Sequence, residues 1–376
     1  MTTPTELRVL QFCHGYDGPF LDCARQYASL FVGTPYKVTT VYLTGAPSVE
    51  VERGSASDEV VFLDYRSRDV RGLKLKAIRD IKRLVAGRNF QFCIAHRFKP
   101  IYVALLGTDL PVIGVHHGFG DYQRLSRKLF ANYFRKRLAL LGVSNAVRNE
   151  IRACLPSWPA ERIETLYNRI DIAAVQAEQV CRDDARAHLG LPQDAWVVGN
   201  VGRLHPDKDQ ATLIRGFAQA LPQLPTGSLL AIMGSGRLES ALKALAAELG
   251  VSTSVRFLGQ VPQGRRYFKA FDVFALTSAH EPFGMVLLEA MAAGVPVICS
   301  DCGGGREVVG ESEWLFALGS AQALGQRLVR MAIERPQSQA DFVEALHDRI
   351  VNMFSDTATR RVFWHLPMLQ SIAREQ

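Results

Sequence analysis

The chain has 376 residues, of which 48% are hydrophobic, and a formal net charge of +7. This length suits two domains of about 100 to 200 residues each, and the apolar content is sufficient for two cores. No run of about 18 apolar residues occurs, and the first residues lack the basic and apolar regions of a signal peptide, so we expect neither a membrane-spanning helix nor secretion.

Short apolar segments rich in β-branched residues recur along the chain. In the first half they lie at 7–13, 37–43, 60–65, 90–96, 111–117 and 138–144. In the second half they lie at 196–204, 228–236, 255–259, 271–278 and 295–301. Continuous apolar strands that alternate with helical patterns indicate parallel sheets covered on both faces, so the two series predict two doubly wound α/β domains.

The boundary between the two domains is predicted near residue 170. After "IETLYNRID" the apolar series gives way to the charged stretch 178–186, and the next strand follows it. We therefore expect an N-terminal domain of residues 1–170 and a C-terminal domain of residues 171–354. Ligands of open parallel sheets bind beyond the carboxyl ends of the strands, so candidate site residues are those directly after each strand.

Two loops of the second domain suit a diphosphate. "VGNVGRLHPDKD" places Arg203 and Lys208 five positions apart, which combines a fork of donors with a mobile point charge. In "MGSGRLESAL", Gly234 and Gly236 permit close approach of the backbone to an anion at the start of a helix. The plainer alternatives are two solvated cations and a tight turn that needs glycine for steric reasons alone.

The segment "SAHEPFGMVLLEAMAAGVPVIC" has two glutamates around the beginning of one helix. Glu281 falls in the loop after a strand, because Pro282 is acceptable only before the helix or in its first turn, and Glu289 falls one to two turns inside. Backbone N–H groups from Phe283 to Val286 are placed to hold phosphate or sugar oxygens. In the plainer alternative, Glu281 caps the helix and Glu289 lies on its solvated face. In another alternative, the two glutamates are the acid and the nucleophile of a glycosidase, but the phosphate-binding features would then have no use.

With its neighbours, this segment resembles the nucleotide-sugar-dependent glycosyltransferases of family four, which have the GT-B fold of two Rossmann-like domains facing across a cleft. The resemblance is carried by "GVSNAVRNEI", "LYNRID", "GRLHPDKD", "MGSG", "VRFLGQV" and "HEPFGMVLLEAMAAGVPVICSD", in the expected order over most of residues 142–311. Residues 1–140 match more loosely. The resemblance implies retaining transfer from a nucleoside-diphosphate sugar, here UDP-linked, with no metal and no cofactor.

The resemblance also implies roles for single residues. Glu281 faces the hydroxyl groups of the donor sugar, Glu289 binds the ribose, and Arg203 with Lys208 holds the diphosphate. The backbone from Arg256 to Val261 contacts the base. The other donor-binding candidates in this half are Gly234, Gly236, Phe283, Gly284, Met285 and Val286.

In the first half, the resemblance places a glycine loop and a histidine in the cleft. The loop is "CHGYDGPF", with Gly15 and Gly18 as donor-binding candidates. "PVIGVHHG" offers His116 and His117, of which His117 fits the spacing better and joins Glu281, Arg203 and Lys208 as a catalytic candidate. His96, at the end of "FQFCIAH", is a further candidate or else a core residue.

The basic charge lies in the first half of the chain. Residues 66–88 contain nine Lys or Arg and two Asp, and residues 124–137 contain six basic residues and no acid. Apolar residues at helical spacing interrupt both stretches: Leu73, Ala77, Ile78, Ile81, Leu84 and Val85 in one, and Leu125, Leu129, Phe130, Tyr133 and Leu138 in the other. Either these are ordinary amphipathic helices on a domain core, or they dock on an anionic membrane surface and attract a phosphorylated acceptor. No nucleic-acid-binding module accompanies the charge, so we expect no nucleic-acid partner.

The seven cysteines, at positions 13, 23, 93, 154, 181, 299 and 302, lie mostly in apolar segments, which is typical of reduced thiols in a cytoplasmic protein. Cys299 and Cys302 have CxxC spacing, which we interpret as a strand end and its loop, because no second pair or His cluster accompanies them. Residues 355–376 contain Phe363, Trp364, Leu366 and Leu369, so we expect this segment to cross back and pack on the first domain, as the last helix of GT-B enzymes does.

These observations predict a cytoplasmic, peripheral, metal-independent glycosyltransferase of the hexosyltransferase type. Its N-terminal domain would bind the glycan or glycolipid acceptor, expected to be a lipopolysaccharide core oligosaccharide, and its C-terminal domain the nucleotide-sugar donor. The alternatives are a nucleotide-sugar epimerase and a non-catalytic nucleotide-sugar-binding module on the same fold.

Overall fold

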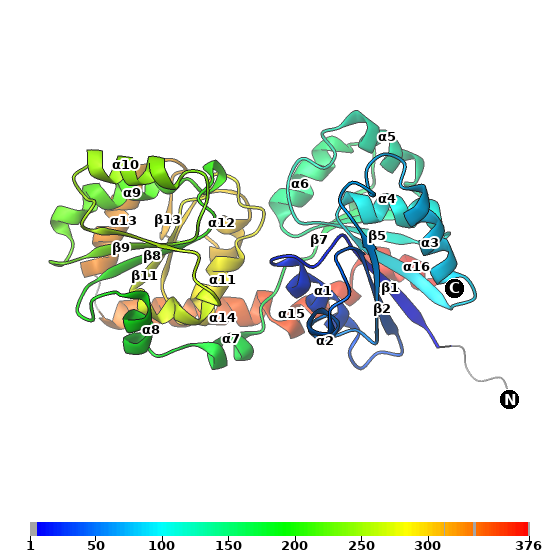
Figure 1. Ribbon diagram of the computed structural model, residues 1–376, viewed down its shortest axis with the longest axis horizontal. Helices are drawn as coiled ribbons and strands as arrows, with labels where there is room; N and C mark the ends of the chain where they lie inside the picture. The colour runs from blue at the N-terminus through cyan, green and yellow to red at the C-terminus, as the bar shows by residue number, and fades with distance from the viewer. Residues whose placement is uncertain (1–5, 312, 334–335, 375–376) are drawn as a thin grey trace. The chain divides into compact units, whose positions relative to one another are not determined.

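The computed structural model describes residues 6–311, 313–333 and 336–374. The chain forms two compact units. Unit 1 comprises the chain up to Arg169 together with the segment from Asp356 onwards, and unit 2 comprises Ile170–Ser355. Each unit is a parallel β-sheet with helices on both faces (Figure 1). The predicted fold class, two doubly wound α/β sheets, is confirmed.

The sheet of unit 1 has the strand order β3-β2-β1-β4-β5-β6-β7, and all neighbouring strands are parallel. The strands are β1 (Arg8–Cys13), β2 (Lys37–Thr44), β3 (Glu59–Tyr65), β4 (Phe90–His96), β5 (Val112–His116), β6 (Leu138–Gly142) and β7 (Ile163–Thr165). The strands β5 and β6 are buried along their whole length, as expected when helices cover both faces. The edge strand β7 escapes prediction because its 3 residues are too few to form a pattern.

The helices of unit 1 connect these strands and cover the sheet (Figure 1). They are α1 (Phe20–Ala28), η1 (Ser29–Phe31), α2 (Val49–Gly54), α3 (Leu75–Val85), α4 (Phe98–Gly107), α5 (Leu125–Tyr133), α6 (Asn145–Cys154) and η2 (Ala160–Arg162). None of the helices in the described residues combines the length and the apolar composition needed to cross a bilayer.

The first basic segment forms a helix that is shorter than its pattern. The helix α3 begins at Leu75, so Leu73 lies outside it and is 67% exposed. Ala77 and Ile81 are buried against the rest of unit 1. The periodicity thus identified the buried side of α3 correctly.

The second basic segment departs further from its predicted pattern. Leu125, Leu129 and Tyr133, spaced by four residues along α5, are 70%, 60% and 82% exposed. Leu138 is the first residue of β6 and not part of the helix. The alternative in which the apolar side of this helix packs on the domain core is therefore wrong for these three residues.

The sheet of unit 2 has the strand order β10-β9-β8-β11-β12-β13 and is also parallel throughout. Its strands are β8 (Val197–Val201), β9 (Leu229–Met233), β10 (Val255–Gly259), β11 (Val273–Leu276), β12 (Val297–Ser300) and β13 (Leu315–Phe316). Each of the strands β8, β9 and β11 is followed by a loop and then a helix. Because the strands are parallel, these three loops all lie at the carboxyl edge of the sheet.

The helices of unit 2 lie on both faces of this sheet (Figure 1). They are α7 (Ile172–Glu178), α8 (Arg182–Leu189), η3 (Pro206–Lys208), α9 (Gln210–Ala220), η4 (Leu221–Gln223), α10 (Glu239–Glu248), η5 (Gly264–Ala270), α11 (Met285–Ala292), α12 (Gly303–Val309), α13 (Ala321–Ile333) and α14 (Pro336–Phe354). α9 packs against α10 and α13, while α11 packs against α12 and α14.

The last segment of the chain belongs to unit 1. It forms α15 (Asp356–Trp364) and α16 (Pro367–Arg374). Phe363 is fully buried and its ring meets that of Phe31, while the indole N–H of Trp364 donates to the Leu30 carbonyl at 3.2 Å. This last segment therefore contributes side chains to the core of unit 1.

Candidate functional site

The loops that follow β8, β9 and β11 in unit 2 lie side by side, because these strands are neighbours in the sheet. Val201 pairs with Met233, so the loop that carries Arg203 runs beside the loop that begins at Gly234. The N–H of Gly202 donates to the Met233 carbonyl, and the N–H of Leu204 donates to the Ser235 carbonyl. The two predicted diphosphate loops are thus joined by main-chain hydrogen bonds.

Lys208 and Glu281 form an ion pair at this edge, although they are 73 positions apart in the sequence. The Lys208 ammonium lies 2.6 Å from Oε2 of Glu281, which also accepts a hydrogen bond from the Ser278 hydroxyl at 2.9 Å. Glu281 is only 7% exposed, and 22% of the Lys208 side chain is exposed. A buried carboxylate needs such partners, and here they come from two different loops.

Main-chain contacts hold these two loops together. The N–H of Ala279 donates to the Asp207 carbonyl at 2.8 Å, and the Thr277 hydroxyl donates to the Lys208 carbonyl at 3.0 Å. The carboxylate of Asp209 then caps α9 by accepting from the N–H and hydroxyl of Thr212. The loop that carries Lys208 is therefore held between the residues that follow β11 and the beginning of α9.

The glycines at the beginning of α12 make a second contact with the Glu281 loop. The N–H of Gly304 donates to the Glu281 carbonyl at 2.8 Å. A Cβ on Gly304 would lie 2.4 Å from Cα of Phe283, and a Cβ on Gly305 would lie 2.9 Å from Sγ of Cys299. Gly304 and Ser278 were absent from the sequence-based candidates because their partners are distant in sequence, although the run "GGG" at 303–305 is a signal of close approach.

The helix α11 begins directly after Gly284, whose φ of 104° suits glycine. Met285, Val286 and Glu289 lie on its partly exposed side, with Glu289 one turn after Met285. Phe283 is buried and its ring meets that of Phe354, so only its backbone is available for a ligand. The predicted loop and helix start are thus brought together, with the Glu289 side chain on the accessible side.

The glycines of the β9 loop have a steric role. A Cβ on Gly234 would lie 1.9 Å from the Gly202 carbonyl oxygen, and a Cβ on Gly236 would lie 2.4 Å from that of Leu204. These glycines therefore let the Arg203 loop approach, which is the plainer of the two alternatives for them. Arg203 itself is exposed, and within the part of the chain described here its side chain makes no hydrogen bond or ion pair.

The two ends of the segment predicted to contact the base, Arg256–Val261, lie in different surroundings. Arg256 is the second residue of β10, and its guanidinium binds the Thr253 carbonyl, which precedes the strand. Its side chain is therefore directed away from the carboxyl edge where Lys208 and Glu281 lie. Val261 follows the strand, and the Gly259 carbonyl accepts from the N–H of Gly234, so the far end of the segment is beside the β9 loop.

Cys299 is buried in β12, and Cys302 precedes α12 with its thiol donating to the Ala279 carbonyl at 2.9 Å. Both are free thiols. Among the described residues, no three His, Cys, Asp or Glu side chains are grouped as metal ligands.

In unit 1, the predicted glycine loop follows β1. A Cβ on Gly15 would lie 2.8 Å from Oγ1 of Thr44, so this position needs glycine for packing. Gly18 has a φ of 59°, and the space around it is open. Of the two, Gly18 is the one with room for a ligand atom.

The three candidate histidines of unit 1 differ in accessibility. His116 is fully buried, and both of its ring nitrogens are engaged, Nδ1 with Asp121 at 2.8 Å and Nε2 with the Tyr122 hydroxyl at 3.2 Å. His117 is partly exposed, and its Nε2 lies 3.0 Å from Nδ1 of His96. His116 thus has a structural role, which leaves His117 as the accessible member of the pair.

The environment of this pair keeps both rings neutral. Burial lowers the pKa of His117 to about 3, with His116 and Arg97 as further causes. Burial, followed by the His117 ring, holds the pKa of His96 well below its usual value. The His117–His96 hydrogen bond therefore joins two neutral imidazoles at pH 7, so one nitrogen donates and the other accepts.

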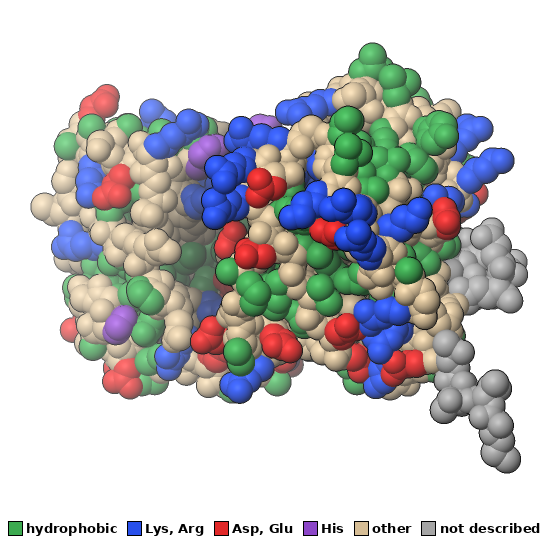
Figure 2. Space-filling view, turned by 45° about the vertical axis from the view of Figure 1, so that its right-hand side comes forward, with side chains coloured by type: hydrophobic (Ala, Val, Ile, Leu, Met, Phe, Trp, Pro, Cys, Tyr) green, Lys and Arg blue, Asp and Glu red, His purple; other side chains and the backbone are tan. Residues whose placement is uncertain are grey.

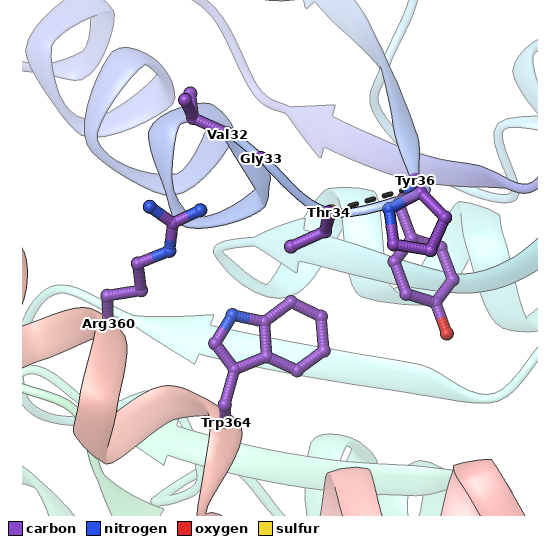
Figure 3. A pocket seen from close by; sticks show the side chains of 7 residues that line it. Val32, Gly33, Thr34, Tyr36, Arg360 and Trp364 are labelled. Carbon is purple, nitrogen blue, oxygen red and sulfur yellow. Dashed lines mark hydrogen bonds between the residues drawn. The ribbon is translucent and has the colours of Figure 1, made fainter.

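A pocket of about 540 Å³ lies elsewhere in unit 1, before the beginning of β2 and thus near the amino-terminal edge of the sheet. Figure 3 shows it between Arg360 and Trp364 of α15 and the loop that contains Val32 and Thr34. None of the predicted site residues lines it. The predicted residues of unit 1 and this pocket therefore lie at opposite edges of the sheet of that unit.

Two family models match the chain. Residues 24–174 match Glycosyltransferase Family 4, and residues 182–348 match Glycosyl transferases group 1. Together they account for most of both units, and the second includes Arg203, Lys208, Glu281 and Glu289.

A curated relative is the lipopolysaccharide core biosynthesis glycosyltransferase LpsE of Rhizobium meliloti (strain 1021), which is 34% identical over 183 residues, or 48% of this chain and 52% of that protein. The chain thus spans about half the length of this relative, and less of several others that it matches.

Solved structures share the fold over the whole chain. A glycosyltransferase from Rickettsia africae ESF-5 superimposes with a TM-score of 0.83 at 15% identity, covering 99% of this chain and 100% of the other. Anabaena Alr3699/HepE in complex with UDP and glucose superimposes with a TM-score of 0.75 at 20% identity, covering 98% and 99%. From the two matching models and the shared two-sheet architecture, the chain belongs to the group 1, family four glycosyltransferases with the GT-B fold.

Proposed function

We propose that the chain is a retaining glycosyltransferase that moves a hexose from a UDP-linked sugar to a glycan or glycolipid acceptor. The observation that carries the proposal is the Lys208–Glu281 ion pair at the carboxyl edge of unit 2, on the loop that also carries the exposed side chain of Arg203. Two cations next to a carboxylate match a ligand with a diphosphate at one end and sugar hydroxyl groups at the other.

The proposed chemistry rests on charge stabilisation. An ammonium has three donors, and Glu281 uses one of those of Lys208, so two remain for the diphosphate. As the bond to the sugar breaks, Arg203 and Lys208 stabilise the negative charge that develops on the leaving diphosphate. In this mechanism these cations take the place of a metal ion. The acceptor hydroxyl attacks from the face that the nucleotide leaves, which retains the configuration.

The remaining donor contacts follow from the same edge of the sheet. Glu281 binds the sugar hydroxyl groups with the carboxylate oxygen that Lys208 and Ser278 leave unused. The N–H groups at the start of α11 bind phosphate or sugar oxygens, and Glu289 binds the ribose. We assign the donor to unit 2 and the acceptor to unit 1, where the neutral side chain of His117 is the catalytic candidate.

The test of this site compares two arginines of unit 2. Arg203→Gln is expected to lower kcat by about 100-fold, because a charge that stabilises the leaving group is lost. Arg256→Gln is the control, since that side chain binds the Thr253 carbonyl, and it should leave turnover unchanged. Full activity of Arg203→Gln would remove the basis of the mechanism.

The donor class is tested by thermal stabilisation with UDP-, GDP-, ADP- and dTDP-sugars in the presence of EDTA. Stabilisation by UDP-sugars despite the chelator supports both the donor and the metal-free site. Conversion of the UDP-sugar into an epimer without any acceptor would support an epimerase instead, and binding without turnover would support a binding module.

We further propose that the acceptor is a lipopolysaccharide core oligosaccharide and that the enzyme works at the inner face of the cytoplasmic membrane. The name of the relative LpsE supports the acceptor class. The exposed stripe of Leu125, Leu129 and Tyr133, which lies among basic residues of α5, supports contact with an anionic bilayer. Leu129→Gln/Tyr133→Gln should weaken binding to phosphatidylglycerol vesicles, and equal binding to phosphatidylcholine vesicles at low salt would contradict the proposal.

A further inference from the structure

Five basic side chains gather at the carboxyl edge of the sheet in unit 1, in the connections that follow β3, β4 and β5 and in the first turns of α4 and α5. They are Arg71, Lys74, Arg97, Lys99 and Arg127. On the face that unit 1 presents in Figure 2, Lys and Arg side chains lie among hydrophobic ones. Arg97 and Lys99 belong to neither of the two basic stretches that the sequence shows, at 66–88 and 124–137.

Aromatic rings hold two of these cations close together. The Lys74 ammonium lies 4.6 Å from the centroid of the Tyr102 ring, and the Arg127 guanidinium lies 4.5 Å from that of Phe98. Both rings meet the ring of Phe130, at 4.8 Å and 5.8 Å between centroids. The cluster is therefore assembled by the aromatic contact between α4 and α5.

The positive charge of this cluster is poorly compensated. Asp121 pairs with Arg127, but it also binds His116. In the described residues, the side chains of Arg71, Arg97 and Lys99 make no hydrogen bond or ion pair. The pKa of Lys99 is lowered by burial and then by Arg97, Arg71 and Arg127, and the pKa of Lys74 by burial and then by Lys99 and Arg127. Such mutual repulsion is relieved when an anion binds among the cations.

Two of the cations also have an uncommon backbone conformation. Lys74 and Arg97 have φ values of 55° and 72°, in the left-handed region that residues with a Cβ seldom adopt. Each lies immediately before a helix. Conformations of this kind cost free energy and are found preferentially where a ligand is held.

The cluster is next to the accessible histidine. Arg97 directly follows His96, and its guanidinium lies 4.6 Å from the centroid of the Phe20 ring, which meets the His117 ring at 6.0 Å. Burial followed by Lys99 and Arg97 lowers the pKa of the nearby His14 to about 4, so these two cations lie towards the end of β1 as well. An anion held by Arg97 and Lys99 would therefore lie beside the part of unit 1 that we assign to the acceptor.

We propose that Arg97 and Lys99, with Lys74 beside them, bind a phosphate group carried by the acceptor glycan. This inference rests on the proposed function, because it takes unit 1 as the acceptor-binding unit. A guanidinium and two ammonium groups suit the several oxygens and the double charge of a phosphate monoester better than a neutral sugar. The phosphate would anchor the acceptor and select phosphorylated glycans over unphosphorylated ones.

The experiment measures binding of a phosphorylated core oligosaccharide, and of the same oligosaccharide after phosphatase treatment, by titration calorimetry. The full chain should bind the phosphorylated form about tenfold more tightly. Arg97→Gln/Lys99→Gln should remove this preference. The matched control, Lys82→Gln/Arg83→Gln, removes the same charge from the last turn of α3 and should keep it. Equal binding of both oligosaccharides, binding of neither, or a preference that survives in the first variant would each overturn the inference.

Two further measurements distinguish this inference from the proposed donor site and from the proposed membrane contact. Thermal stabilisation by UDP should be the same in both double variants, and its absence from the unsubstituted protein would refute the proposed donor without affecting the phosphate preference. Binding to phosphatidylglycerol vesicles distinguishes the source of the phosphate. If Arg97→Gln/Lys99→Gln loses vesicle binding but keeps its preference for the phosphorylated oligosaccharide, the cluster binds lipid headgroups and the inference is wrong.

Discussion

Glu281 is the residue on which the loops of unit 2 converge. Its carboxylate receives hydrogen bonds from Lys208 and Ser278, and its carbonyl receives one from Gly304. Three loops that are far apart in the sequence therefore depend on one side chain and its backbone. A carboxylate that organises its surroundings in this way is already oriented when a ligand arrives, which reduces the entropy cost of binding.

The Lys208–Glu281 pair can be tested by a double-mutant cycle. Lys208→Met should lower the free energy of unfolding by about 2 kcal/mol, because it leaves a buried carboxylate with one donor; the loss is less than for a fully buried pair, since Lys208 is partly exposed. Adding Glu281→Gln should recover part of the loss. Urea denaturation of the single and double variants measures the coupling, and strictly additive effects would mean that the two residues do not stabilise each other.

The paired histidines of unit 1 predict how stability depends on pH. His117 has a folded-state pKa of about 3, below its value of about 6.5 in the unfolded chain, so the unfolded state takes up the proton first. Its contribution is complete above pH 6.5 and is lost as the pH falls towards 3, by about 1.4 kcal/mol per pH unit. His96, whose pKa is also lowered, acts in the same direction.

Urea denaturation between pH 7 and pH 5 tests this dependence. His96→Asn/His117→Asn should flatten the decline in stability with falling pH, whatever its effect at pH 7. His365→Asn, which replaces an exposed histidine, is the control and should keep the slope of the unsubstituted protein. An unchanged slope in the double variant would contradict the assignment of neutral rings.

At the scale of elements, most strands were predictable because each is a continuous apolar segment rich in β-branched residues. The strands β7 and β13, with 3 and 2 residues, are too short to form such a segment. For α5 the sequence left two alternatives open, because helical spacing identifies an apolar side but not whether a partner covers it.

The candidate site likewise contains residues whose place could be predicted from the sequence and residues whose place could not. The places of Glu281, Lys208 and the start of α11 in the fold could be predicted from the sequence, because they lie in the connections that follow the apolar strands β8 and β11. Ser278 and Gly304 contribute through contacts that form only when the loops fold together. Such pairings across the sheet leave no local pattern in one sequence.

The contact between α12 and the Glu281 loop is tested by Gly304→Ala. The added Cβ would lie 2.4 Å from the backbone of Pro282 and Phe283, so the loop must shift, at a cost of about 2 kcal/mol. UDP-sugar binding should weaken with it. Gly118→Ala is the control, because a Cβ there meets no atom within 4 Å. Unaltered stability and UDP-sugar affinity of Gly304→Ala would show that this contact does not position the loop.

At the scale of the whole molecule, unit 1 is made from two parts of the chain and unit 2 from one. Arg169, which is 2% exposed, ends the first part and pairs with Asp356, where the second part begins, at 2.6 Å. The ring of Phe363 is fully buried against this unit. The last segment is therefore a structural part of unit 1.

Phe363→Ala should destabilise unit 1 by about 3 kcal/mol, because it removes a buried ring. Hydrogen exchange should then show lost protection in β1–β6, while β8–β12 remain protected. Val362→Ala, at a neighbouring residue that is 45% exposed, should change little. Equal loss of protection in both sheets would mean that the segment stabilises the two units alike.

This division of unit 1 has a consequence for synthesis on the ribosome. Unit 2 is continuous, so all of its residues are synthesised before α15 and α16. The strands of unit 1 emerge first but lack Phe363 and its neighbours throughout that time. The part of the protein that is translated first is thus the last to be completed, and a nascent chain halted before Asp356 would expose the Phe31 surface to chaperones.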